Sequence, residues 1–257
     1  MNGRAQFIAF RAILVKEVLR FTRIWIQTIL PPMITTALYF VIFGRLIGSQ
    51  IGDIHGFQYM EYIVPGLILM AVITNSYANV VASFYSAKFQ HNIEEMLVAP
   101  VPNYLIMIGF IGGGVARGLA VGVAVTIVAL CFTAIPLHNL WVAVSVLLLT
   151  SVLFSLAGLI NAIYATSFDH ISIIPTFVLT PLTYLGGVFY SVAMLPPLWQ
   201  SVSLANPILY MVNAFRYGLL GVSDVNLAAA YLAIVGFIAV LFSFALYLLN
   251  RGYGIRS

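Results

Sequence analysis

Residues 140–164 read LWVAVSVLLLTSVLFSLAGLINAIY, with no charged side chain and only isolated serine, threonine and asparagine among apolar residues. The hydrocarbon core of a bilayer is about 30 Å thick, and roughly 20 consecutive apolar residues are needed to cross it as a helix. This stretch therefore predicts a transmembrane helix, the clearest one in the chain.

The rest of the chain has a similar composition. Of its 257 residues, 62% are hydrophobic and 7% are charged, whereas a soluble domain carries about 25% charged residues. Lipid must therefore be the solvent for most of the surface. We predict an all-α polytopic membrane protein, a single transmembrane domain over residues 1–257. The six predicted spans are 24–47, 60–84, 104–132, 140–164, 171–190 and 227–249.

Residues 1–23 are amphipathic. At about 100° per residue, one broad face carries apolar side chains from Phe7 to Phe21, and the opposite face carries Lys16, Arg20 and Arg23. Arg11 interrupts the apolar side. Such a helix is typical of an interfacial segment that lies in the plane of the membrane, in contact with lipid. The alternative, an ordinary soluble helix, has little in this chain to pack against.

The basic residues predict the orientation, because cytoplasmic loops are enriched in Lys and Arg. With the N-terminus in the cytoplasm, eight basic residues lie on that side and two, Arg45 and Arg216, lie on the other. Both termini are therefore predicted to be cytoplasmic. The cytoplasmic set is Arg4, Arg11, Lys16, Arg20, Arg23, Lys88, Arg251 and Arg256.

Two connections between spans are distinctive. The cytoplasmic loop 86–103 is charged and contains a potential short helix around Ile93–Val98. The external segment 190–222 is long and apolar, with prolines at Pro196-Pro197 and Pro207. Its apolar pieces are too short to span. They predict re-entrant or interfacial helices whose irregular backbone is buried in protein or lines water.

Several kinds of chemistry are excluded by missing residues. A phosphate-binding P-loop requires Gly-x-x-x-x-Gly-Lys-Ser/Thr, and neither Lys16 nor Lys88 has that context. Cys131 is the only cysteine, so an internal disulfide cannot form. The four histidines are scattered over loops on both sides, and no basic patch suggests nucleic-acid binding. We expect no catalytic residue, no metal site and no cofactor in this chain.

Small and polar residues recur along the spans. Gly114, Gly118 and Gly122 are spaced for close helix packing. Two polar stripes have two readings, as hydrogen bonds between helices or as the lining of a substrate path. These stripes comprise Asn75 and Asn79, with Ser83, on the second span, and Thr176, Thr180, Thr183 and Tyr184 on the fifth.

Arg117 falls within the third span. An ionisable residue inside the membrane is a functional hypothesis by default. We favour a structural role, in which Arg117 lies shallow near the cytoplasmic edge and pairs with a loop acid such as Glu94 or Glu95. Asp53, Glu61, Asp169 and Asp224 lie at or beyond the ends of the spans.

Taken in order along the chain, these features resemble the permease subunits of the ABC-2 type transporter family, and are most similar to inner-membrane transport permeases of Gram-negative bacteria. The resemblance covers nearly the whole chain. It is carried by the amphipathic N-terminus and by YIVPGL (62–67), NIEEMLVAPV (92–101), PLTYLGGVFY (181–190), LPP (195–197), Asn206-Pro207 and Arg216.

The resemblance implies a homodimer that binds two copies of a cytoplasmic ATP-binding cassette ATPase, with ATP and Mg²⁺ held by that partner. It implies that residues 1–23 form a connecting helix and that external re-entrant helices lie between spans five and six. In this family more basic residues often precede the acidic pair, whereas His91 and Asn92 stand here. The implied coupling helix contains Asn92, Ile93, Glu94, Glu95, Met96 and Leu97.

We therefore expect the membrane-embedded subunit of an exporter in the bacterial inner membrane, which itself is not an enzyme. A separate ATPase would drive alternating access, and the substrate is not encoded in a recognisable form. The alternative is a secondary, ion-coupled transporter. Such transporters usually place interrupted helices at matching positions in two halves, whereas Pro31-Pro32 in the first span has no counterpart in the fourth.

Overall fold

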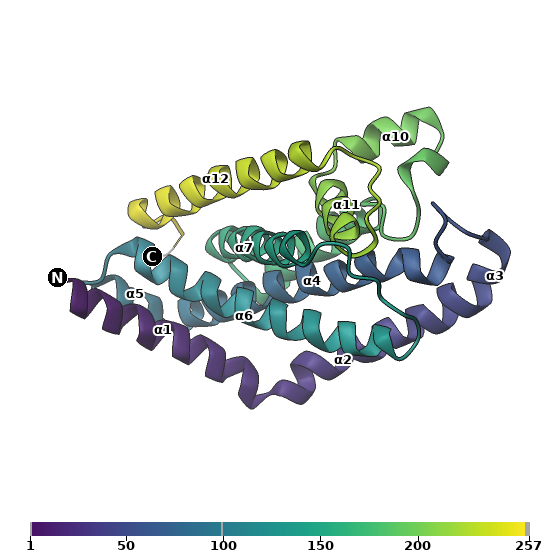
Figure 1. The fold of residues 1–257 in the computed structure, drawn as a ribbon. Coiled ribbons are helices and arrows are strands. Elements are labelled where there is room, and N and C mark those ends of the chain that lie inside the picture. Colours follow the sequence, from purple (N-terminus) through teal and green to yellow (C-terminus); the bar gives the residue numbers. More distant parts are fainter. Residues whose placement is uncertain (1, 99, 255–257) are drawn as a thin grey trace.

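The structure of the chain is a computed structural model that describes residues 2–98 and 100–254, without the side chains of Arg45, Leu46, Ser49 and Leu97. The described residues are almost entirely helical (Figure 1). Five helical segments are long and apolar enough to cross a membrane: Trp25–Gly44, Tyr59–Phe89, Asn103–Leu130, Leu140–Tyr164 and Leu227–Arg251. The chain is thus a polytopic helical protein, as predicted.

The helix that organises the bundle is α4 (Tyr59–Phe89). Its 31 residues span about 46 Å at 1.5 Å per residue. It packs most extensively against α7 (Leu140–Tyr164) and α6 (Asn103–Leu130). Because α4 is the most buried of the five long segments, its polar residues meet protein rather than lipid. In Figure 1, α4, α6 and α7 form the centre, with α12 (Leu227–Arg251) along one flank.

The N-terminal helix α1 (Gly3–Arg23) breaks from α2 (Trp25–Tyr39) at Ile24, whose backbone leaves the helical region. Figure 1 shows the two helices meeting at an open angle. The helix in residues 1–23 is therefore confirmed. Its buried side overlaps the predicted apolar face at Phe21 and extends to Ile13 and Glu17, where α1 lies against α6. Phe7, from the apolar face, is 63% exposed.

The first span continues beyond α2 through the π-helical η1 (Phe40–Ile47) and the short α3 (Gly48–Ile51). The fifth predicted span, 171–190, is shorter and less regular than expected. It consists of α8 (Phe168–Ile174), the π-helical η2 (Pro175–Leu179) and α9 (Thr180–Tyr184). Pro175 and Pro181 each lack a backbone donor, so a regular α-helical ladder cannot run through this segment.

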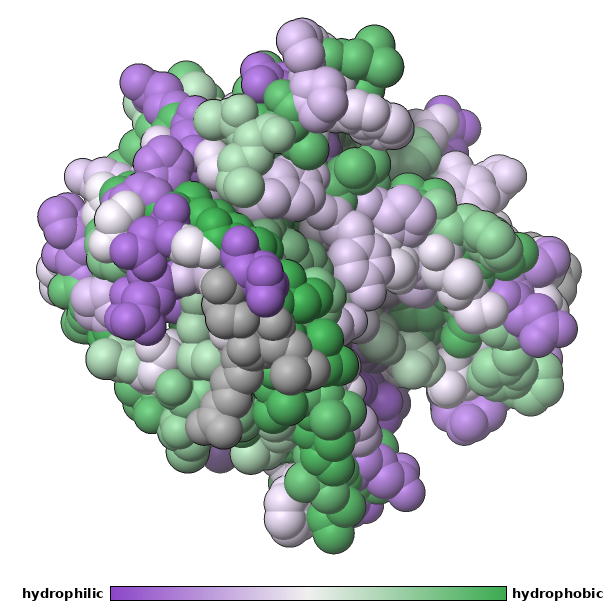
Figure 2. All heavy atoms as spheres, turned by 90° about the vertical axis from the view of Figure 1, so that its right-hand side faces the viewer, coloured by the Kyte–Doolittle hydropathy of each residue, from purple (hydrophilic) through white to green (hydrophobic). Residues whose placement is uncertain are grey.

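The external segment 190–222 contains a 3-10 turn η3 (Val192–Met194) and two helices, α10 (Pro197–Leu204) and α11 (Pro207–Leu220). Asn206 caps α11 with its side chain. Figure 1 places α3 and α10 at one end of the molecule and both termini, with α5 (Asn92–Val98), at the other. We call these the α10 end and the α5 end. Viewed directly, the α10 end mixes polar and apolar residues (Figure 2).

Glycine permits the close contact between α4 and α6. A Cβ added at Gly114 would lie 2.6 Å from Val80 Cγ2, and one at Gly118 would collide with the Ser76 hydroxyl. In lipid, helices associate through such close packing of small residues. The packing role predicted for this glycine row is confirmed.

Gly118→Val should therefore destabilise the bundle by about 1–3 kcal/mol, the usual cost of overpacking. The measurement is the thermal unfolding midpoint of the purified protein in detergent. Gly236→Val in α12 is the matched control, because a Cβ there meets nothing within 4 Å. Equal midpoints for the two variants would contradict the packing role of Gly118.

Candidate functional site

A polar ladder runs along the middle of α4. Asn79 Oδ1 accepts a hydrogen bond of 2.8 Å from Arg20 Nη2 of α1, and the Asn79 carbonyl accepts a second of 3.0 Å from the same nitrogen. One turn away, Asn75 Oδ1 accepts a bond of 3.0 Å from Arg117 Nη2 of α6. The two asparagines predicted as a stripe therefore each hold an arginine from a different helix.

Glu17 lies beside this ladder and is fully buried. Its Oε2 is 3.5 Å from Arg20 Nε. A buried carboxylate without a partner costs several kcal/mol of desolvation, so this ion pair fixes the face of α1 that turns inward. Arg20 was expected on the polar face of this helix, and Glu17 was not among the predicted site residues. Glu17 and Arg20 are three residues apart and so share one face of the helix. This spacing could have predicted the ion pair from the sequence.

Arg117 lies at the middle of α6, not near its end, and it contacts Asn75 rather than Glu94 or Glu95. The predicted pairing with a loop acid is wrong. Among the described residues, the ion pairs within 4.0 Å involve Glu17, Glu94 and Asp224, and none includes Arg117. The cluster of Glu17, Arg20 and Arg117, which we call the cationic junction, thus carries one surplus positive charge.

A groove lies between α2 and α4, with a volume of about 250 Å³. Asn75 lines one part of the groove and also accepts the hydrogen bond from Arg117. The groove and Arg117 are therefore linked through this one side chain. The remaining walls are mostly apolar. They are formed by Pro31, Pro32, Thr35, Thr36, Tyr39, Leu67, Met70, Ala71 and Thr74.

The polar stripe of the fifth segment is arranged differently. Thr176 and Thr180 are exposed, whereas Thr183 is buried and its hydroxyl donates to the Leu179 carbonyl at 2.7 Å. The hydroxyls of Tyr184 and Tyr39 lie 3.1 Å apart. None of these four residues hydrogen-bonds Asn75 or Asn79 among the described contacts. No direct hydrogen bond joins the two predicted stripes among the described contacts, but Tyr39, which bonds Tyr184, lines the groove together with Asn75.

At the α10 end, a fully buried arginine joins three segments. The Arg216 guanidinium of α11 lies 4.0 Å from the centre of the Tyr62 ring in α4, a favourable cation–π arrangement. Its Nη2 donates to the Gly187 carbonyl at 2.6 Å, and its Nη1 donates to Asn213 Oδ1 at 3.4 Å. Arg216, predicted as an external loop residue, instead pins the start of the external segment to α4.

Asp224 makes the second connection at this end. Its Oδ1 accepts from the Ser191 hydroxyl at 2.9 Å and lies 3.1 Å from His55 Nε2, and its Oδ2 accepts from the Val192 amide at 3.0 Å. The backbone amide of Asp224 donates to Asn213 at 2.9 Å. These bonds and those of Arg216 form one network, which we call the external clamp.

At the opposite end, α5 covers most of the predicted coupling segment. Ile93 is fully buried and Met96 packs beside it on the core, while Glu95 is exposed. His91 Nδ1 lies 2.9 Å from Glu94 Oε1, and the Asn92 side chain donates to Gln90 at 3.2 Å. The side chain of Leu97 lies outside the described residues. The segment is therefore a short helix, held by one apolar side and presenting an acidic side.

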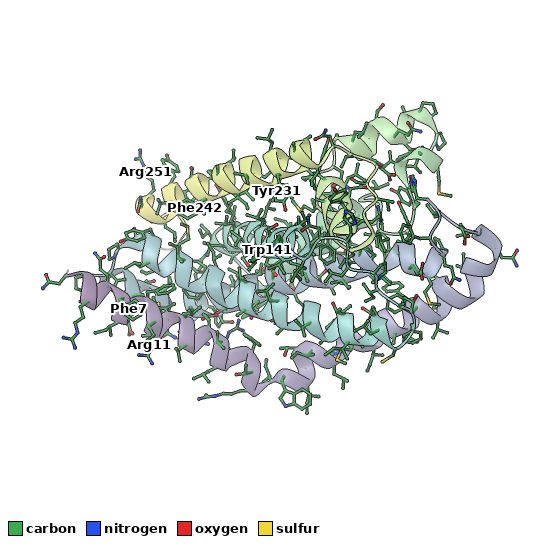
Figure 3. The ribbon with its side chains drawn as sticks, in the orientation of Figure 1. Phe7, Arg11, Trp141, Tyr231, Phe242 and Arg251 are labelled. Atoms are coloured by element: carbon green, nitrogen blue, oxygen red, sulfur yellow. The ribbon has the colours of Figure 1, made fainter. Side chains whose placement is uncertain are left out.

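Two hydrogen bonds join α4 to the end of α7 at the α5 end of the molecule. Lys88 Nζ donates to the carbonyls of Ile163 and Ala165, at 2.8 and 2.7 Å, joining the ends of α4 and α7. At the same end, Arg11 and Arg251 point away from the bundle (Figure 3). Within the described ranges no group of three His, Cys, Asp or Glu side chains converges as a metal site would require.

Similarity to known proteins identifies the family of this chain. The chain matches the ABC-2 type transporter family over residues 8–220. It is 58% identical over 252 residues to the inner membrane transport permease YadH of Escherichia coli strain K12 and to that of Shigella flexneri, covering 98% of both chains in each case. Nodulation protein J of Rhizobium leguminosarum bv. viciae is 23% identical, covering 88% of each chain.

The similarity to inner-membrane transport permeases anticipated from the motifs is thereby confirmed. With the family match extending from α1 through α11 and the YadH similarity running almost from end to end, this chain belongs to the ABC-2 type transporter family as a membrane-embedded permease.

Proposed function

We propose that this chain is the permease subunit of an ATP-binding cassette exporter in the bacterial inner membrane, driven by a separate ATPase. The observation that carries the proposal is α5. It is a short acidic helix at the end that holds both termini (Figure 1), anchored by the buried Ile93 and exposing Glu95. A helix that is firmly attached on one side and charged on the other is suited to transmit movement from a docked motor.

We further propose six crossings, with both termini in the cytoplasm. Both termini lie at the α5 end, which five crossings alone would not allow. The segment from Phe168 to Tyr184 supplies the sixth. It begins beside the α7 end that Lys88 contacts, and it leads to Phe189, whose carbonyl accepts a bond of 3.0 Å from Tyr59 at the other end of α4. Arg256, counted for the orientation, lies outside the described residues.

In the proposed mechanism, two copies of the chain pair and two ATPases bind their α5 helices, with ATP and Mg²⁺ held by the ATPases. ATP binding draws the α5 helices together. Movement reaches α4 directly, because α5 packs against it, and α1 follows because Arg20 is hydrogen-bonded to Asn79 of α4. The substrate path would then run between the copies. Its proposed lining is Asn75, Asn79, Thr176, Thr180, Thr183 and Tyr184.

Ion-coupled transport finds less support in the described residues. Ion-coupled carriers commonly place a titratable acid near mid-membrane. Glu17 is the buried acid of the cationic junction and lies against α6 one turn from Arg117, but it is already committed to an ion pair with Arg20. The external clamp supports a gated exit for export. Its hydrogen bonds hold the segment between α9 and α12 against the end of α4.

Reversing the charge of α5, in the variant Glu94→Arg with Glu95→Arg, should abolish docking of the ATPase. The measurement is copurification of the two subunits and permease-stimulated ATP hydrolysis, which we expect to fall by at least about ten-fold, equivalent to 1.4 kcal/mol. Asp53→Arg, exposed near the opposite end, is the control for a charge reversal away from α5. Unchanged complex formation and hydrolysis in the double variant would remove α5 from the coupling role.

Asp224→Ala should loosen the external clamp. Hydrogen bonds to a charged group contribute about 1.5–3 kcal/mol, so amide hydrogen exchange at Val192 and its neighbours should accelerate roughly 10–100-fold. Mass spectrometry of the peptide around residues 190–196 measures this. Asp169→Ala, exposed at the α5 end, serves as the comparison. Equal exchange in both variants would show that Asp224 does not hold this segment.

A further inference from the structure

Arg117 is a cation in the middle of a membrane-spanning helix, and among the described residues no carboxylate lies within 4.0 Å of it. It is half-buried, and its Nε is buried without a hydrogen-bond partner among the described residues. The other cation of the junction, Arg20, bonds Asn79, one turn along α4 from the Asn75 that Arg117 bonds. Since Glu17 is committed to Arg20 at 3.5 Å, an anion from outside the chain would complete the cationic junction.

The groove between α2 and α4 supplies an apolar compartment next to this charge. The Thr74 hydroxyl donates to the Met70 carbonyl at 3.0 Å, so it offers little polarity to a ligand. The two consecutive prolines, Pro31 and Pro32, have no backbone N–H. The groove's 250 Å³ is smaller than the roughly 300–1,000 Å³ of sites for drug-sized ligands. This volume admits part of a single alkyl chain, and the rest of a longer chain would extend into the surrounding lipid.

Asn75 connects the two features. It lines the groove, and its Oδ1 accepts the bond of 3.0 Å from Arg117 Nη2. Its Nδ2 donates to the Ala71 carbonyl at 3.0 Å, which holds the amide in this orientation. A ligand lying in the groove therefore meets Asn75, and immediately behind it the uncompensated guanidinium.

We propose that the groove and Arg117 together form a binding site for an anionic single-chain amphiphile, and that this is the class of substrate the permease exports. The alkyl chain lies in the groove, and the anionic head group, a sulfate, phosphate or carboxylate, pairs with Arg117. A guanidinium binds such oxyanions through parallel hydrogen bonds, and Nε and Nη2 would both turn from their present surroundings toward the anion. The assignment of a substrate rests on the transport function proposed above; binding itself does not.

The test uses the full-length permease in nanodiscs of zwitterionic phosphatidylcholine, without an ATPase. Equilibrium binding of radiolabelled hexadecyl sulfate is compared with that of hexadecanol, which has the same chain and no charge. The wild-type protein should bind the sulfate at least about ten-fold more tightly. Arg117→Gln should abolish this preference, and Arg117→Lys should retain most of it. Arg23→Gln, which removes an exposed arginine of α1, should leave the preference unchanged.

A second variant tests the groove. Ala71→Phe fills the groove without removing a charge and should weaken binding of both ligands, so the proposal can be tested even if Arg117→Gln does not fold. Equal affinities for sulfate and alcohol, or a preference that survives Arg117→Gln, would overturn it. Displacement of hexadecyl sulfate by phosphatidylglycerol at bacterial membrane content would assign the site to bulk lipid and also overturn the substrate assignment.

Because binding needs no ATPase, the two proposals fail separately. A permease that binds hexadecyl sulfate selectively but shows no ATPase partner would contradict the proposed function, and with it the substrate assignment, but not the binding site. A permease that stimulates its ATPase but binds sulfate and alcohol equally would contradict this inference alone.

Discussion

The arrangement of the N-terminal half depends on burying charge at the junction of α1, α4 and α6. Glu17 cannot enter an apolar interior alone, because an unpaired buried carboxylate costs several kcal/mol. Arg20 meets it at 3.5 Å and continues to Asn79. This pair decides which face of α1 turns inward, and with it the path by which α1 leaves the bundle at Ile24.

α4 carries both polar networks of the molecule. Near one end its Tyr62 supports Arg216 and the external clamp, and toward the other its Asn75 and Asn79 hold Arg117 and Arg20. Helices of this length in a packed bundle move largely as rigid bodies, by hinge or shear. A displacement of α4 at the cationic junction would therefore also move the residues of the external clamp. The same helix that gives the bundle its core is the natural link between the proposed motor end and the proposed exit.

Hydropathy predicted the fold well, since lipid imposes length and apolarity on each span. The helix at 140–164 was placed to the residue, and the segments near 60–84, 104–132 and 227–249 were close to their observed bounds. The fifth segment differed because Pro175 and Pro181 interrupt its hydrogen-bond ladder, an effect that hydropathy does not measure. The short helix expected near Ile93 was also found.

Side-chain partners were harder to predict, because periodicity identifies a helix face but not the neighbour that covers it. Arg117 was expected to reach Glu94 or Glu95, yet α6 presents it to α4 at mid-height, where Asn75 is the only bonded partner among the described residues. Likewise, the buried face of α1 contains both apolar and charged residues. Its packing depends on the charged pair Glu17 and Arg20, which a pattern of apolar residues does not identify.

The sign of the mid-membrane charge distinguishes two ways of powering transport. A carboxylate takes up and releases protons within a physiological range once burial raises its pKa, whereas a guanidinium remains protonated. The unpaired charge at the centre of this bundle belongs to an arginine. It can attract an anion but cannot carry a proton through a cycle. Under the proposed function, the bundle selects what it binds through this charge, and the work of moving the bound molecule comes from the ATPase that docks on α5.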